Sequence, residues 1–182
     1  MAKKKSSVTM YNLIFPVFML LWPPLWLMMP IFGDLAGGLF VLGILLGNLA
    51  VDWLVTALAM RWQKIPNIKQ KSLKALVPVW LSGFAADFVG GLFLFAVVFI
   101  DNDWISQNIE IYFYTSIYEG SWALAVTLLA VALAGFCIYR FNMNWSLQQV
   151  DLTEQQRRRT ALTLAVLTAP WLFLLPTDWF YV

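Results

Sequence analysis

The chain lacks histidine altogether and contains a single cysteine, Cys137, among its 182 residues. One cysteine excludes a disulfide within the chain, and the usual Cys/His ligands of zinc sites are missing. The commonest general base of enzymes is missing too. The sequence also has no glycine-rich phosphate loop, no nucleophile with a base to activate it, and no basic groove typical of nucleic-acid binding. We therefore expect no enzyme, no metal or other cofactor, and no nucleic-acid partner.

Charge is scarce as well. Only 12% of the residues are charged and 61% are hydrophobic, whereas roughly a quarter of the residues in soluble domains are charged. Five apolar stretches are long enough to cross a hydrocarbon core, which takes about 20 helical residues. They lie at 11–32, 35–60, 75–100, 121–139 and 160–176. The sequence predicts an all-α integral membrane bundle of about five transmembrane helices, forming one polytopic domain over residues 1–182.

The first apolar stretch follows a basic start, Met1 to Lys5, as the hydrophobic region of a signal peptide would. Its length of roughly 20 residues exceeds the ~7–15 residues of such a region. Asp34 also lies where a cleavage site would have a small residue. We interpret 11–32 as an uncleaved first span.

Basic residues are absent from every second connecting segment. All twelve Lys and Arg residues precede the first span, separate the second and third spans, or separate the fourth and fifth. The alternate segments contain acidic residues and no basic one: Asp34, Asp101, Asp103, Glu110, Glu119 and Asp178. Positive residues favour the cytoplasmic side. We therefore expect a multi-pass protein of the cell membrane, with its N-terminus in the cytoplasm and its C-terminus outside.

Two connecting segments have some structure of their own. The segment 101–120 is too polar to span, and its aromatic residues favour a helix or hairpin that lies on the outer membrane interface. The inner segment 141–159 resembles a short amphipathic piece leading into the fifth span. Asp151 and Thr153 are both plausible caps for that helix.

Two carboxylates remain inside the predicted spans, Asp52 and Asp87. Asp52 lies nine residues from Arg61, and Asp87 lies thirteen residues from Lys74. At 1.5 Å per helical residue these separations place them roughly 13 and 20 Å from the basic ends of their spans. A carboxylate at such depth costs on the order of 3 kcal/mol, so it should face protein or water and suggests a functional site.

The neighbours of these carboxylates suit an ion site. Asn48 and Thr56 lie one turn before and after Asp52 and form a polar stripe with it. Spans two and three are joined by a short connector, so they are expected to pack antiparallel with both carboxylates facing one cavity. Such a cavity could bind a proton or a small cation. Trp53 and Phe88, beside the two carboxylates, could line it or offer cation–π contact to an organic cation.

Glycines mark candidate helix contacts. Gly43 and Gly47 are four residues apart in the second span, and Gly83 and Gly90 flank Asp87 in the third. Small residues let helices approach closely in membranes, either within one chain or between subunits. Five helices form a thin bundle, so a homo-oligomer or another membrane subunit is a plausible partner besides the lipid bilayer.

Two functions remain open at this point. The first is a small transport protein: a channel, a cation- or proton-coupled transporter, or a membrane subunit of one. The second is a non-transporting membrane scaffold or assembly partner, in which the intramembrane carboxylates bind a neighbouring helix instead of an ion. A third, an intramembrane enzyme acting on lipid, is disfavoured because carboxylates are the only acid–base groups within the spans.

Overall fold

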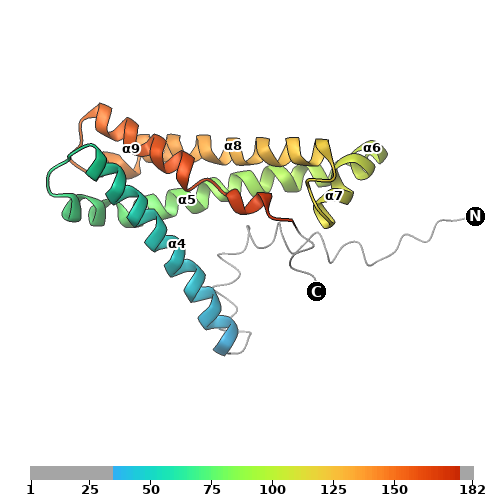
Figure 1. Ribbon diagram of the computed structural model, residues 1–182, viewed down its shortest axis with the longest axis horizontal. Helices are drawn as coiled ribbons and strands as arrows, with labels where there is room; N and C mark the ends of the chain where they lie inside the picture. Colours follow the sequence, from blue (N-terminus) through green and yellow to red (C-terminus); the bar gives the residue numbers. More distant parts are fainter. Residues whose placement is uncertain (1–34, 177–182) are drawn as a thin grey trace, which may run out of the picture.

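The computed structural model describes residues 35–176, and every regular element within them is a helix (Figure 1). The all-α class is therefore confirmed for this part of the chain, while the expected span 11–32 lies outside the described residues. The four long helices are α4 (Leu35–Trp62), α5 (Ile68–Val98), α8 (Ser121–Asn144) and α9 (Glu154–Leu167). The shorter elements are α6 (Asp103–Ile105), the π-helix η1 (Ser106–Glu110), α7 (Ile111–Tyr114), and the 3-10 helices η2 (Ser146–Gln149) and η3 (Trp171–Leu174).

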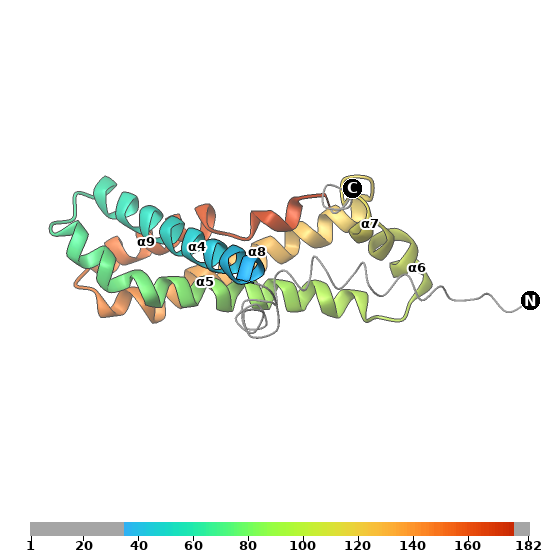
Figure 2. The ribbon, with the colours of Figure 1, turned by 90° about the horizontal axis from the view of Figure 1, so that it is seen from below.

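Helices α5 and α8 run antiparallel and lie side by side along most of their length (Figures 1 and 2). Helix α9 packs against α8 and α4, and α4 crosses α5 at an angle. The first half of α4 extends away from the other helices (Figure 1). The described part of the chain is therefore a bundle in which α4 and α5 meet along the second half of α4.

Small and hydroxylic side chains let α5 and α8 approach closely. A methyl group added at Gly90 would lie 3.1 Å from the Cβ of Ala134 and 3.2 Å from the carbonyl oxygen of Ala130. Nearer the start of α5, the Ser146 hydroxyl lies 2.6 Å from the Ser82 hydroxyl and donates to the Pro78 carbonyl at 2.9 Å. Glycine thus allows close contact between α5 and α8. Hydroxyl groups join α5 to η2, which directly follows α8.

The connectors between α4 and α5 and between α8 and α9 meet at one end of the bundle (Figure 1). The first turn of α5 contacts the α8–α9 connector, because Lys71 Nζ donates to the Asp151 carbonyl at 2.7 Å and lies 3.8 Å from the Asp151 carboxylate. Thr153, rather than Asp151, caps α9: its side chain accepts from the Gln156 N–H, and the Gln156 side chain accepts from the Thr153 N–H. This reciprocal pair is a capping box.

At the opposite end, the segment 101–120 is largely helical. This agrees with the first of the two expected forms, a helix, and not with a hairpin. Asn102 starts it by accepting hydrogen bonds from the N–H groups of Trp104 and Ile105, at 2.9 and 3.3 Å. The Trp104 ring packs edge-on against Trp122 at the start of α8, with 5.5 Å between ring centroids. These contacts tie the connector to the end of the α5–α8 pair.

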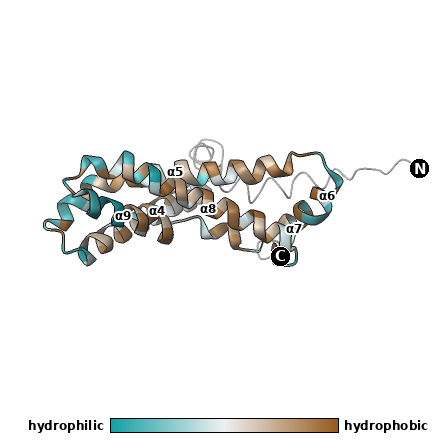
Figure 3. Ribbon diagram, turned by 90° about the horizontal axis from the view of Figure 1, so that it is seen from above, coloured by the Kyte–Doolittle hydropathy of each residue, from teal (hydrophilic) through white to brown (hydrophobic). Residues whose placement is uncertain are grey.

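Two of the described helical segments, α5 and Ser121–Gln149, are long and apolar enough to cross a membrane. In their most apolar windows only 28% and 33% of the residues are buried. Figure 3 accordingly shows apolar residues along much of both helices. A helix that is apolar all round is typical of a protein core or a membrane span, and the low burial of these two does not fit a core helix.

The stretch expected as a fifth span, 160–176, is not one continuous helix. Helix α9 ends at Leu167, and η3 follows after Pro170. Proline has no N–H to continue the helical ladder and disfavours the helical conformation of the residue before it. The 14 residues of α9 measure about 21 Å at 1.5 Å per residue, less than the about 30 Å of a hydrocarbon core.

Candidate functional site

Asp52 lies in the second half of α4, where that helix packs against α5. Its side chain is only 3% exposed, and it is the only charged residue of α4 before Arg61. Thr56, one turn later and 1% exposed, donates its hydroxyl to the Asp52 backbone carbonyl at 2.7 Å and not to the carboxylate. The Oδ2 atom of Asp52 is buried and has no hydrogen-bond partner among the described residues.

The facing surface of α5 carries Gly83 and, one turn later, Asp87. A methyl group added at Gly83 would lie 3.5 Å from Asp52 Oδ2, so this carboxylate rests against the α5 backbone where α5 has no side chain. Asp87 Oδ1 is also buried without a hydrogen-bond partner in the described part of the chain. Asp52 Oδ2 therefore lies against α5 one turn from Asp87, and each of the two carboxyl groups has one buried oxygen without a partner among the described residues.

The other residues expected around the carboxylates, Asn48, Trp53 and Phe88, are more exposed than Asp52. Asn48 is half-buried, one turn before Asp52. Trp53 is 37% exposed, and its indole N–H donates to the Ser72 hydroxyl of α5 at 3.1 Å. Phe88 is 48% exposed. Both rings are therefore partly exposed on the described bundle, and their expected role beside the carboxylates stays a prediction.

The four glycines expected at helix contacts divide into two pairs. Gly83 and Gly90 lie where α5 meets α4 and α8, as described above. At Gly43 and Gly47, an added methyl group would have no described atom within 4 Å. These two glycines belong to the half of α4 that extends away from the bundle (Figure 1).

Four further buried polar atoms that lack a hydrogen-bond partner among the described residues were not anticipated from the sequence: Gln63 Oε1, Trp80 Nε1, Asn142 Oδ1 and Arg157 Nε. Trp80 belongs to α5 and Asn142 to α8. The Asn142 amide nitrogen donates to the Ile138 carbonyl at 2.8 Å, so only its oxygen is left. The Trp80 ring packs edge-on against Phe84, with centroids 4.8 Å apart. The spacing of Trp80, Gly83 and Asp87 was the available signal, because residues three, four and seven apart share a helix face.

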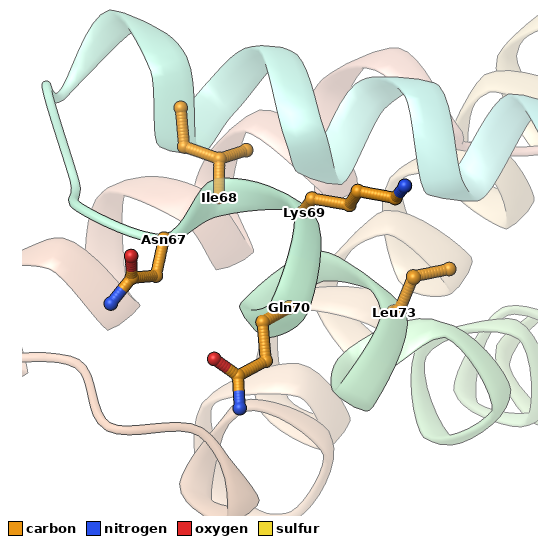
Figure 4. A pocket seen from close by; sticks show the side chains of 5 residues that line it. All are labelled: Asn67, Ile68, Lys69, Gln70 and Leu73. Atoms are coloured by element: carbon orange, nitrogen blue, oxygen red, sulfur yellow. The ribbon is translucent and has the colours of Figure 1, made fainter.

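An open hollow of about 550 Å³ lies at the start of α5, lined by Asn67, Ile68, Lys69, Gln70 and Leu73 (Figure 4). Neither Asp52 nor Asp87 lines this hollow. Within residues 35–176, no group of three or more His, Cys, Asp or Glu side chains is arranged to hold a metal ion. The chemistry available at the α4–α5 interface is therefore that of two carboxyl groups, which can take up a proton or attract a cation.

Comparison with models of protein families, with curated proteins and with solved structures gives no match to this chain.

Proposed function

We propose that this protein is a small multi-pass membrane transport protein in which Asp52 and Asp87 bind a proton or a small cation during its passage across the bilayer. One observation carries the proposal: Asp52 Oδ2 of α4 is buried against Gly83 of α5, one turn from the buried Asp87 Oδ1, and neither oxygen has a partner among the described residues. A buried carboxylate without a partner is strongly disfavoured unless a proton or a cation neutralises it.

The proposed membrane arrangement has five spans, with the N-terminus in the cytoplasm and the C-terminus outside. The α4–α5 and α8–α9 connectors, and the helix ends beside them that carry most of the basic residues, lie at one end of the bundle, and the acidic segment 101–120 lies at the other (Figures 1 and 3). This distribution supports an orientation in which the basic end faces the cytoplasm. The low burial of the apolar windows of α5 and Ser121–Gln149 supports contact with lipid along the sides. In this arrangement the carboxylates lie within the hydrocarbon region, where an ionisable residue suggests an ion pathway.

The proposal is tested by flux through purified protein reconstituted in vesicles, with a pH-sensitive dye inside and the cation of the medium varied. We expect flux in the native protein and its loss in Asp52→Asn and in Asp87→Asn, because an amide neither carries the negative charge nor exchanges a proton. Asp101→Asn is the matched control, since Asp101 is an exposed carboxylate in the connector and its loss should leave flux unchanged. Native flux in both intramembrane variants would overturn the proposal.

The alternative, a non-transporting scaffold or assembly partner, has one observation in its favour. Leu42 and Leu46 are 50% and 53% exposed beside the open Gly43 and Gly47 on the first half of α4. This function predicts no flux in vesicles and a second membrane protein that remains bound through purification in mild detergent. Mass measurement of the purified particle distinguishes the two functions.

A further inference from the structure

A third buried group lies on the side of α5 that carries Gly83 and Asp87. Trp80 precedes Gly83 by three residues and Asp87 by seven, which places all three on one side of the helix. Its indole nitrogen is buried and has no hydrogen-bond partner among the described residues. The same is true of Asp52 Oδ2 and Asp87 Oδ1. The edge-on contact with Phe84 fixes the ring at this level of α5. This side of α5 therefore carries one unpartnered donor, Trp80, and one unpartnered acceptor, Asp87, and the second acceptor, Asp52 of α4, lies against Gly83 between them.

The chemistry of that donor discriminates between a proton and a metal ion. An indole N–H donates hydrogen bonds and accepts none, so it cannot ligate a metal cation. Metal cations such as Na⁺, Mg²⁺ and Ca²⁺ are held by several oxygen atoms, and an N–H among the ligands would direct its positive end at the ion. A carboxylate that has lost its proton, in contrast, is stabilised by a donated N–H.

We infer that the ion handled by the Asp52–Asp87 pair is a proton, and that Trp80 is the residue that makes its release possible. The inference rests on the proposed function and specifies its substrate. One proton is shared by the two carboxyl groups, so that the pair carries one negative charge instead of two. When that proton leaves, the Trp80 N–H donates to the carboxylate that becomes charged. On uptake an O–H bond forms with a proton from water on one side, and on release that proton passes to water on the other.

The helices that pack around Trp80, Gly83 and Asp87 carry few charged or titratable groups. Helix α4 has only Arg61 besides Asp52, at its end, and α5 has lysines only in its first two turns. The remaining groups lie on α8 and α9: Cys137, Tyr139, Arg140, Glu154, Arg157, Arg158 and Arg159. The one ion pair among the described residues joins Lys71 and Asp151, and neither Asp52 nor Asp87 forms one. The pH response of the site should therefore come from the pair itself.

The test measures proton uptake into vesicles against pH for the native protein and Trp80→Phe. Phenylalanine keeps a ring against Phe84 and removes the N–H. Because the variant no longer stabilises the charged carboxylate, its pair should hold the proton to higher pH. A hydrogen bond to a charged group corresponds to a shift of about one to two pH units in the midpoint. Trp62→Phe is the control, since Trp62 is 68% exposed at the end of α4 and should leave the midpoint in place.

Two further measurements separate the inference from the proposed function. Proton uptake should continue when a large organic cation replaces Na⁺ and K⁺, and infrared spectra should show a protonated carboxyl band that Asp52→Asn or Asp87→Asn alters. A strict need for Na⁺ or K⁺, together with loss of flux in the Asn variants, would overturn the proton and leave the transport function standing. Equal midpoints in Trp80→Phe and Trp62→Phe would overturn the role of Trp80. Absence of any flux in the native protein would overturn the transport function itself, whatever the infrared spectra show.

Discussion

The contact between α5 and α8 at Gly90 provides a quantitative test of the packing. A methyl group added at this position would lie 3.1 Å from the Ala134 Cβ, 3.1 Å from Phe173 Cε2 and 3.2 Å from the Ala130 carbonyl oxygen. One of these atoms belongs to the backbone, and the three surround the methyl group together, so they would all have to move by a few tenths of an ångström. Overpacking of this kind costs about 1–3 kcal/mol.

Gly47→Ala is the matched control for Gly90→Ala, because an added methyl group at Gly47 has no described atom within 4 Å. Alanine is favoured over glycine inside a helix by about 1 kcal/mol, and this gain applies to both variants. The difference between them therefore isolates the packing cost. We expect Gly90→Ala to be less stable than Gly47→Ala by about 1–3 kcal/mol.

The assay is denaturant unfolding of both variants in the same detergent, followed by the circular dichroism of the helices. Comparison within one detergent removes the contribution of the micelle. Equal stability of the two variants would mean that α5 and α8 do not approach closely at Gly90, and the α5–α8 packing described above would then be wrong.

Three further predictions concern single side chains. Gly83→Ala should fold normally, since its methyl group would meet Asp52 Oδ2 at an ordinary 3.5 Å. It should nonetheless slow flux in vesicles by covering that oxygen; unchanged flux would contradict the site. Thr153→Ala should destabilise the protein by about 1 kcal/mol through loss of a helix cap, measurable by thermal unfolding, whereas no change would argue against the cap. Burial, then the hydrogen bond to Glu110 and its charge, raise the pKa of Tyr114. Its stabilising contribution should thus be present below about pH 10, the usual tyrosine value, and be lost above it. Tyr114→Phe should therefore remove a phase above pH 10 from a tyrosine absorbance titration, and an unchanged titration above pH 10 would refute the assignment.

The long helices could be predicted from apolar length and charge. The expected stretches 35–60, 75–100 and 121–139 correspond to α4, α5 and α8, which extend further only at their basic ends. Those extensions add interfacial and basic residues that a search for apolar runs leaves out. The cap at Thr153 was also foreseeable, because Gln156 follows it at the spacing of a capping box.

The break between α9 and η3 was harder to predict from the sequence. The stretch 160–176 has the composition of a span, but Pro170 ends the helix after α9 has begun six residues before the expected start. Apolar composition indicates burial in lipid or protein and does not by itself fix the backbone conformation. Proline position was the better signal here.

The candidate site was predictable in its carboxylates and not in its surroundings. A charged residue within an apolar run is recognised at once, and the glycine at i−4 from Asp87 indicated a close helix approach. The directions of Trp53 and Phe88 depend on the crossing of α4 over α5, which no local pattern contains. Trp80 was overlooked because tryptophan is common in apolar helices, and the lack of a partner for its N–H is visible only in the folded chain.

The most direct test of the paired carboxylates is the proton flux of Asp52→Asn, Asp87→Asn and the double variant, compared in vesicles at equal protein density. Groups that act as one unit are strongly non-additive. If one ion is held between the two residues, each single variant should lose as much flux as the double variant. Two single variants that each retain part of the flux, with losses that multiply in the double variant, would contradict a shared site.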